Sequence, residues 1–456
     1  MNTAPYLEGL NERQKEAVLT IDGPLMVLAG AGSGKTRVIA HRIVHLIHQG
    51  VPPHHILAVT FTNKAAKEMR DRVHNLMRQF PTSRQSGLDS SPTVTTFHSL
   101  GVRLLREHHE TLDLRKHFSI YDRSDSVKAL KEALTIAGYS PKQFEPRRIL
   151  SVISKAKGDA IRKSEFVESA SSYIERVVGE VWGHYEQILK KDGALDFDDL
   201  LLSTLGLLES YPVVREVLQD RYQYIHVDEY QDTNKVQYEI ARLLAGARQN
   251  ICVVGDIDQN IYSWRGADIK NILQFERHFQ GAKTVLLEEN YRSTKTIIAA
   301  SNSVIKQNRN RVDKTVFTNN HDGEKLTIFS ALTGADEAEY AALSSKRLIE
   351  NGAAPSDIAV LFRTNFQSRA LEEAFLNYDV PYQVLGVKFF ERKEIKDMLS
   401  YLRLALNPGS TSDLARVANT PPRGLGKVTV LKMIEGRGAE VTGVAKDKVA
   451  KFNELM

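Results

Sequence analysis

The sequence is poor in cysteine and tryptophan, and it contains no long apolar run. Its single cysteine, Cys252, excludes a disulfide within the chain and favours a reducing compartment. Cys252 lies in an apolar segment, where a lone cysteine usually acts as a small hydrophobic residue and not as a nucleophile. No apolar run approaches the ~18 residues of a membrane-spanning helix, and the N-terminus has no basic and apolar leader pattern. We therefore expect a soluble, cytoplasmic protein.

A strong excess of charge of one sign is also lacking. The formal net charge is only +5 over 456 residues, which hints at an anionic partner without establishing one. Between Thr60 and His117, however, basic residues outnumber acidic ones and alternate with Phe and His side chains. This mixture suits a polyanion with stackable bases, although a solvated helix face has a similar composition. The apolar share of 42% is enough for the cores of about two to four domains.

Short apolar runs rich in β-branched residues recur along the chain, each ending in a polar or glycine-rich turn. They are residues 25–30, 56–61, 93–98, 224–228, 251–256 and 284–290. Helical patterns separate most of them, so the sequence predicts an α/β fold with a parallel sheet and crossover helices. Ligands of such sheets collect at the carboxyl ends of the strands. Most of the unusual side chains of this sequence follow these runs.

The domain organisation is predicted from the places where this pattern changes. From about residue 102 to 220 helical patterns predominate, so we expect a helical insertion between two strands of one sheet. A second α/β unit is expected to begin near Gly281, with further strands at residues 326–331 and 357–363, and a helical tail is expected from Arg392. The stretch that most resembles a linker is residues 79–92.

The run AGAGSGKT follows the first predicted strand and precedes a predicted helix. Glycines free the backbone N–H groups to wrap phosphates, Lys35 would reach the β and γ phosphates, and Thr36 would hold Mg²⁺. Ala29 stands where a first glycine is usual, and a merely flexible loop is the alternative. The predicted nucleotide-binding residues of this run are Ala29, Gly30, Ala31, Gly32, Ser33, Gly34, Lys35 and Thr36.

Two adjacent acids follow the predicted strand that ends at Val227. Phosphoryl transfer to water needs one carboxylate for the metal and another group to orient or deprotonate the water. We therefore expect Asp228 to bind Mg²⁺ and Glu229 to act on the attacking water. A DE pair alone could be a solvated strand end, but the phosphate loop upstream favours the catalytic interpretation. Gln14 can bond the two edges of an adenine, although exposure is the usual state of a glutamine.

Nine motifs together carry a family resemblance. They are LNERQ, AGAGSGKT, AVTFTNKAAKEM, TTFHSL, LDFDDLL, VDEYQDT, VVGDIDQNIYSWRGA, EENYRS and FFERKEIKD, in that order. With them the sequence resembles the UvrD/Rep/PcrA family of superfamily 1 DNA helicases over essentially its whole length. The resemblance implies RecA-like P-loop NTPase domains. The implied parts are domain 1A (residues 1–105 and 195–280), the helical insertion 1B (106–194), the first part of domain 2A (281–391) and the start of helical 2B (392–456).

The resemblance also implies roles for residues around ATP. Arg37 and Tyr291 would pack on the two faces of the adenine that Gln14 reads. Gln259 would sense the γ-phosphate. Arg292 would be an arginine finger from the second motor domain, which would make domain closure and hydrolysis one event.

Single-stranded DNA is the second ligand that the resemblance implies. Aromatic faces stack on successive bases without regard to base identity. The implied contacts are Thr60, Phe61, Asn63, His98, Tyr262, Trp264, Arg265, Arg363 and Asn365. A buried core position is the alternative for Phe61 and for Phe97. Because Gln259 and Trp264 lie in one short segment, we expect that segment to connect the γ-phosphate with the binding of a DNA strand.

The sequence reaches Met456 without a stretch that resembles the last two motor motifs of the family. We expect an ATP-dependent DNA helicase or translocase of 3′ to 5′ polarity that acts at single-stranded DNA and junctions in DNA repair or replication, with proteins of those pathways as candidate partners. The alternative is a truncated module that binds ATP and single-stranded DNA without unwinding. A helicase–nuclease subunit is disfavoured because no nuclease-like carboxylate cluster follows Phe390.

Overall fold

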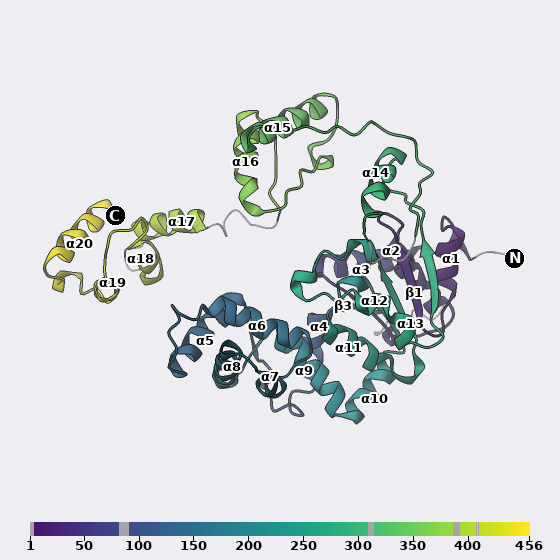
Figure 1. The fold of residues 1–456 in the computed structure, drawn as a ribbon, viewed down its shortest axis with the longest axis horizontal. Coiled ribbons are helices and arrows are strands. Elements are labelled where there is room, and N and C mark those ends of the chain that lie inside the picture. Colours follow the sequence, from purple (N-terminus) through teal and green to yellow (C-terminus); the bar gives the residue numbers. More distant parts are fainter. Residues whose placement is uncertain (1–3, 82–90, 309–313, 386–392, 407, 409) are drawn as a thin grey trace. The chain divides into compact units, whose positions relative to one another are not determined.

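The computed structural model describes residues 4–81, 91–308, 314–385, 393–406, 408 and 410–456. The chain forms two compact units, Met1–Leu326 and Thr327–Met456 (Figure 1). Most of the expected linker at residues 79–92 and the expected domain boundary at 391/392 lie outside the described residues. Within the described ranges, no helix combines the length and the apolar character needed to cross a membrane.

The first unit is built on a six-stranded sheet with the order β3-β2-β6-β7-β1-β8, in which all pairings are parallel. Its strands are β1 (Leu25–Ala29), β2 (Ile56–Thr60), β3 (Thr93–Thr96), β6 (Tyr224–Val227), β7 (Ile251–Gly255) and β8 (Lys283–Leu287). The predicted α/β fold with a parallel sheet is therefore confirmed. The run at 93–98 ends early as a strand because the Thr96 side chain caps the helix that begins at Phe97.

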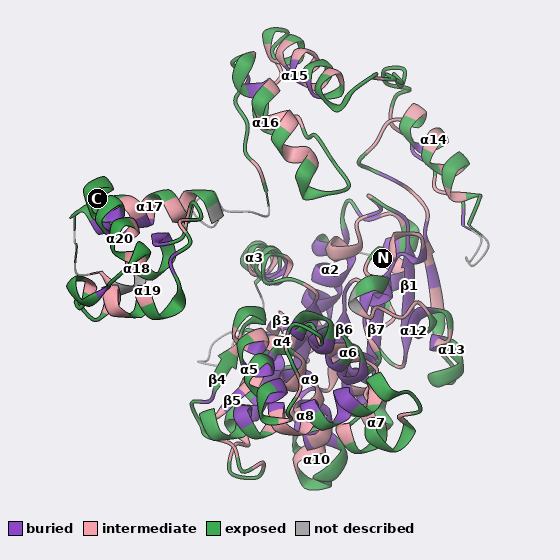
Figure 2. Ribbon diagram, turned by 60° about the vertical axis from the view of Figure 1, so that its left-hand side comes forward, coloured by how far each residue is buried: buried purple, intermediate pink, exposed green. Residues whose placement is uncertain are grey.

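Helices cover both faces of this sheet, which explains why β1, β2 and β7 are buried along their whole length. Leu25 and Val27 of β1 face one apolar cluster, and Met26 and Leu28 face the other. The first cluster includes α1 (Glu12–Leu19), α2 (Lys35–His48) and α3 (Asn63–Gln79). The second includes α4 (Phe97–Glu107), α9 (Phe197–Ser210), α10 (Pro212–Arg221), α11 (Lys235–Ala245), α12 (Lys270–Leu273) and α13 (Phe275–His278). Figure 2 shows the buried strands beneath helices whose outer faces are exposed.

The insertion between α4 and α9 is mainly helical, as expected, and has its own apolar core around the fully buried Trp182. Its helices are α5 (Arg123–Ile136), α6 (Pro146–Gly158), α7 (Lys163–Ser169) and α8 (Tyr173–Asp192). It also contains a small parallel pair that the sequence did not predict, β4 (Ser119–Tyr121) and β5 (Ala194–Asp196). Strands of three residues are too short to show an apolar alternation.

The position of β8 differs from the sequence-based expectation. We expected residues 284–290 to open a second α/β unit, but β8 pairs with β1 as the sixth strand of the first sheet. Its register runs from Leu25↔Lys283 to Ala29↔Leu287, so it pairs backbone groups that would otherwise lie at a sheet edge. Helix α14 (Lys295–Ile305) follows within the same unit. The residue limits of the expected domains stay a prediction.

Among the described residues of the second unit, all the regular elements are helices. Its helices are α15 (Gly334–Glu350), α16 (Ser368–Asn377), α17 (Lys393–Leu406), α18 (Thr411–Val417), α19 (Lys427–Ile434) and α20 (Val444–Leu455). The strands predicted at 326–331 and 357–363 are wrong, because neither segment is paired as a strand. Their apolar side chains stay open to solvent, with Ile328 96% and Leu361 93% exposed. A strand needs a neighbour for its backbone groups, and among the described residues these two segments have none.

Candidate nucleotide and nucleic-acid site

The glycine-rich loop between β1 and α2 forms a cradle of backbone groups. Gly32 and Gly34 have φ values of +67° and +87°, a region in which a side chain is strained. A Cβ at Gly32 would also lie 2.6 Å from Nδ2 of Asn290. Ser33 Oγ donates a hydrogen bond of 2.7 Å to the Gly30 carbonyl and closes the loop. Helix α2 begins directly after it, so its N-terminal N–H groups and dipole favour an anion here.

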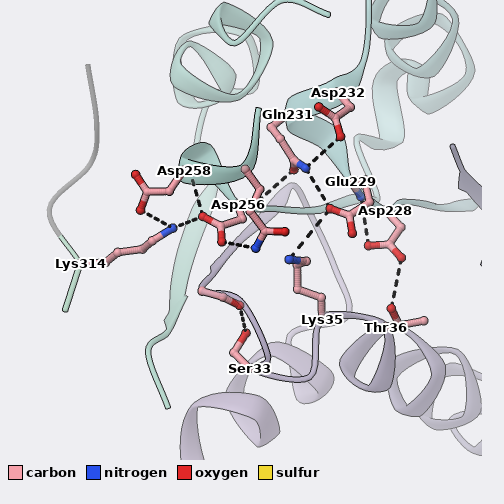
Figure 3. A network of polar contacts seen from close by, with 12 residues as sticks. Ser33, Lys35, Thr36, Asp228, Glu229, Gln231, Asp232, Asp256, Asp258 and Lys314 are labelled. Atoms are coloured by element: carbon pink, nitrogen blue, oxygen red, sulfur yellow. Dashed lines mark hydrogen bonds and ion pairs between the residues drawn. The ribbon is translucent and has the colours of Figure 1, made fainter. Parts of the chain in front are cut away.

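Asp228 and Glu229 follow β6 and lie beside this loop (Figure 3). Thr36 Oγ1 is 3.4 Å from Asp228 Oδ2, and Lys35 Nζ is 4.0 Å from Glu229 Oε2. Asp228 is buried, and this burial, followed by the charge of Glu229, raises its pKa to about 7. A cation beside Asp228 would remove much of the free-energy cost of keeping this buried carboxylate ionised. The predicted pairing of loop and carboxylates is therefore present in the fold.

The residues at this position fit Mg²⁺ that arrives with a nucleotide. The described part of the chain has no group of three or more His, Cys, Asp or Glu side chains able to hold a metal ion. Mg²⁺ typically takes one or two protein oxygens and fills its remaining positions with phosphate oxygens and water. Thr36 Oγ1 and Asp228 Oδ2 are an incomplete set of this kind.

Gln231, which sequence reasoning missed, connects the ends of β6 and β7 (Figure 3). Its Nε2 donates to Glu229 Oε2 at 2.9 Å, and its Oε1 accepts the backbone N–H of Asp256 at 2.9 Å. Gln259 Nε2 donates to Asp256 Oδ2 at 2.6 Å. A Cβ at Gly255 would lie 2.6 Å from Gln231 Oε1, so this contact requires glycine. Gln259 is thus connected to Glu229 through Asp256 and Gln231.

The expected adenine residues lie at the other side of the loop. Gln14 is 1% exposed, and its Nε2 donates to the Ser33 carbonyl at 2.9 Å, so it supports the loop directly. Tyr291 is 47% exposed and donates from Oη to Glu289 Oε2 at 2.6 Å. Burial and then Glu289 raise the pKa of Tyr291 to about 12, which keeps this phenol protonated. Arg37, in the first turn of α2, is partly exposed.

The segment after β8 is bound to the loop through Asn290, a second residue that sequence reasoning missed. Asn290 Nδ2 donates to the Ala31 carbonyl at 2.6 Å, and its Oδ1 accepts the backbone N–H of Arg292 at 2.9 Å. The backbone N–H of Tyr291 donates to the Gly32 carbonyl at 3.0 Å. Arg292 is thereby held beside the loop with an exposed side chain.

Three of the expected DNA-binding aromatic residues form one surface group. The Phe61 ring stacks on Tyr262, with centroids 5.1 Å apart and planes at 25°. The Tyr262 ring is 6.4 Å from Trp264, which is 69% exposed. Phe97, in contrast, is a buried core residue. The surface group offers stackable faces at the carboxyl ends of β2 and β7, which is the arrangement that suits unpaired bases.

The other expected DNA contacts on the first unit are mixed. Asn63 is exposed at the start of α3. Thr60 is 1% exposed, so the structure does not support a contact from its side chain. His98 is half-buried, and burial lowers its pKa, which favours the neutral ring. Its ring is 5.7 Å from that of Phe197, an aromatic residue 53% exposed that sequence reasoning missed although it lies in the motif LDFDDLL.

The remaining predicted contacts are on the second unit or outside the description. Arg363 and Asn365 are exposed, and Asn365 begins the 3-10 helix η8 (Asn365–Gln367). The side chain of Arg265 lies outside the described residues.

Comparisons with known proteins identify the family of this chain. Residues 10–280 match the family model of the UvrD/REP helicase N-terminal domain, and residues 285–455 match that of the UvrD-like helicase C-terminal domain. Similar relatives include the ATP-dependent DNA helicase PcrA of Staphylococcus aureus (strain Mu50), 45% identical over 431 residues, and that of Staphylococcus epidermidis (strain ATCC 12228), 45% identical over 430 residues. Each alignment covers 94% of this chain and 58% of the relative, so the chain spans little more than half the length of these proteins. The chain belongs to the UvrD/REP helicase family.

Proposed function

We propose that this chain binds and hydrolyses ATP and couples hydrolysis to 3′ to 5′ movement on single-stranded DNA, as a helicase of DNA repair or replication. The observation that carries the proposal is the polar path from Glu229 through Gln231 and Asp256 to Gln259, which continues along the chain to Tyr262 and Trp264. The name of the relatives, ATP-dependent DNA helicase, supports it.

In this proposal the chain's own residues prepare the reaction. Lys35 and the N-terminal N–H groups of α2 bind the phosphates, and Thr36 and Asp228 would hold Mg²⁺. When bound there, the ion would supply neutralisation of charge on the phosphate oxygens. Glu229 orients the attacking water and accepts its proton, while Gln231 holds the Glu229 carboxylate in place.

The remaining predicted residues act at the two ends of the nucleotide. Gln14, Arg37 and Tyr291 bind the adenine. Gln259 and Arg292 act at the γ-phosphate, where Arg292 stabilises the charge that develops in the transition state. Asn290 serves this function indirectly, because it fixes the backbone N–H of Arg292 to the nucleotide loop.

For the DNA strand we propose that bases stack on the surface group of Phe61, Tyr262 and Trp264. Stacking on an aromatic side chain contributes about 1–3 kcal/mol per base and does not depend on its sequence. His98 and Phe197 extend the aromatic surface, and Asn63 and Arg265 are candidate polar contacts. Arg363 and Asn365 would supply contacts from the second unit.

A second candidate function is binding of ATP and single-stranded DNA without unwinding. It is favoured by one observation, that the apolar segments 326–331 and 357–363 of the described chain are not paired as strands. A motor domain that lacks paired strands there would bind its ligands but transmit little force. Proteins of repair or replication are candidate partners under either function.

Steady-state ATP hydrolysis, measured with and without single-stranded DNA, tests the proposal. We expect DNA to raise the rate, and Lys35→Ala to abolish hydrolysis because it removes the cation at the phosphates. Equal rates with and without DNA would contradict coupling. Duplexes with a 3′ or a 5′ single-stranded tail then separate the two functions. Unwinding of the 3′-tailed duplex alone supports the helicase of the proposed polarity, and DNA-stimulated hydrolysis without unwinding supports the second candidate.

A further inference from the structure

Lys314 reaches the nucleotide site from a distant segment, and none of the roles above uses it. Its Nζ contacts the Asp256 carboxylate and lies 3.2 Å from Asp258 Oδ2 (Figure 3). The side chains of Lys314 and Asp256 are only 4% and 3% exposed. Both acids follow β7, whereas the lysine comes after α14. The ion pair therefore joins two parts of the first unit that are far apart in the sequence.

Asp256 is shared between Lys314 and Gln259. Its Oδ1 contacts Lys314 and accepts the backbone N–H of Asp258 at 3.0 Å, while its Oδ2 accepts the side-chain amide of Gln259 at 2.6 Å. A buried carboxylate whose one oxygen is bound to a cation has a fixed orientation and a lower cost of burial than an unpaired buried carboxylate. The other oxygen of Asp256 then fixes the amide of Gln259.

The segment that carries Lys314 is itself packed against the nucleotide loop. The Phe317 carbonyl accepts the backbone N–H of Asn290 at 2.7 Å. A Cβ on Gly30 would lie 2.7 Å from Cγ2 of Val316. The position of Lys314 therefore depends on the loop and on the segment after β8.

We propose that Lys314 is a positioning residue that orients the amide of Gln259 through Asp256. In this role it transmits the state of the phosphate loop to the segment that carries Tyr262 and Trp264. The role rests on the proposed function, because it has meaning only if Gln259 acts at the γ-phosphate during hydrolysis.

The test is ATP hydrolysis at saturating single-stranded DNA by the wild type, Lys314→Met, Lys314→Arg, Gln259→Ala and the double variant Lys314→Met/Gln259→Ala. We expect Lys314→Met to lower kcat about 10- to 100-fold with the KM for ATP changed less than about threefold, since the substitution removes orientation and not ground-state binding. Lys314→Arg, which keeps the cation, is expected to recover part of the rate. The double variant is expected to be within about threefold of Gln259→Ala, because the two residues act as one unit.

Lys157→Met is the matched control for the loss of a buried cation. Lys157 Nζ is 2.7 Å from Asp196 and 2.6 Å from Asp199, and its side chain is 1% exposed. We expect this variant to melt at a lower temperature with an unchanged kcat. If Lys314→Met does not fold, Lys314→Gln, which removes the cation but keeps a hydrogen-bond donor beside the two carboxylates, replaces it in the same comparison with Gln259→Ala.

Two results would overturn the inference. One is a kcat of Lys314→Met equal to that of the wild type, and the other is a double variant whose loss is the product of the two single losses. Failure of the proposed function gives a different result, because the wild type itself would then hydrolyse no ATP or would not respond to DNA.

Discussion

At the scale of single residues, Asp228 shows how burial makes a carboxylate favour its protonated form. Its pKa is raised from an ordinary 3.8 to about 7, mainly by burial. The folded chain therefore binds a proton that the unfolded chain has already released between these values. The contribution of this group to the free energy of unfolding is fully present below pH 3.8. It is progressively lost as the pH rises from 3.8 to about 7, and it is absent above about pH 7.

The first prediction concerns Asp228→Asn in the absence of nucleotide. We expect this variant to melt at a higher temperature than the wild type at pH 8, by about 2–4 °C for each kcal/mol recovered, because it removes a buried charge that has no metal beside it. The difference should shrink as the pH falls toward the ordinary pKa of an aspartate. Scanning calorimetry at several pH values measures it, and a lower melting temperature at pH 8 would contradict the burial argument.

The second prediction concerns Trp264, the most exposed member of the surface group that it forms with Phe61 and Tyr262. Trp264→Ala is expected to weaken single-stranded DNA binding about 5- to 150-fold, which corresponds to the loss of one stacking contact. ATP binding measured without DNA should not change. Ile261→Ala, at a neighbouring position that is 68% exposed but not aromatic, is the control. Fluorescence anisotropy of labelled DNA measures the DNA affinity of both variants. Equal losses of affinity in Trp264→Ala and Ile261→Ala would refute a stacking role.

The residues that could be predicted from the sequence are those that lie in local motifs. Lys35, Thr36, Asp228 and Glu229 lie close after the ends of β1 and β6, and the parallel sheet brings the carboxyl ends of these strands to one edge. Gln231 and Asn290 act by contacts across the chain, and an amide side chain has no local pattern that indicates its partner. The structure was needed to find them.

At the scale of elements, the loop between β1 and α2 illustrates how close packing constrains a sequence. Position 32 requires glycine for two reasons. Its φ is positive, and a Cβ there would lie 2.8 Å from the Cβ of Arg292. The motif shows only that glycine occurs here, whereas the structure distinguishes a conformational reason from a packing reason.

The third prediction compares Gly32→Ala with Gly23→Ala. Both glycines have positive φ, at +67° and +77°, but a Cβ at Gly23 meets nothing within 4 Å. We expect both variants to lose about 1 kcal/mol of stability from backbone strain, and only Gly32→Ala to lose nucleotide affinity, by about tenfold or more. Titration of a fluorescent ATP analogue measures the affinity. Similar affinity losses in the two variants would show that strain alone is responsible.

The same scale explains which elements were predicted. The six strands of the first sheet were confirmed because each segment has a paired neighbour, although β3 and β8 are buried only at alternate positions. Residues 326–331 and 357–363 have equally apolar runs, yet they are not strands. A strand needs a neighbouring strand to pair with, and the local sequence does not show whether one is present. The place of β8 beside β1 could not be predicted for the same reason.

At the scale of the whole molecule, the proposed function couples the binding of two ligands, ATP and single-stranded DNA. The expected nucleotide residues meet at one end of the sheet, and the aromatic surface group lies at the carboxyl ends of β2 and β7. Gln259 and Trp264 are separated by only a few residues of one segment. Nucleotide and DNA should therefore change each other's affinity by the same factor, as linkage requires.

The most direct test of this coupling is the affinity for single-stranded DNA measured with and without a non-hydrolysable ATP analogue and Mg²⁺. We predict that the two dissociation constants differ about fivefold or more in the wild type, and that the difference is lost in Gln259→Ala, which keeps Lys35, Thr36 and the aromatic surface group. Equal affinities in the wild type would contradict the central claim that nucleotide binding and DNA binding by this chain are coupled.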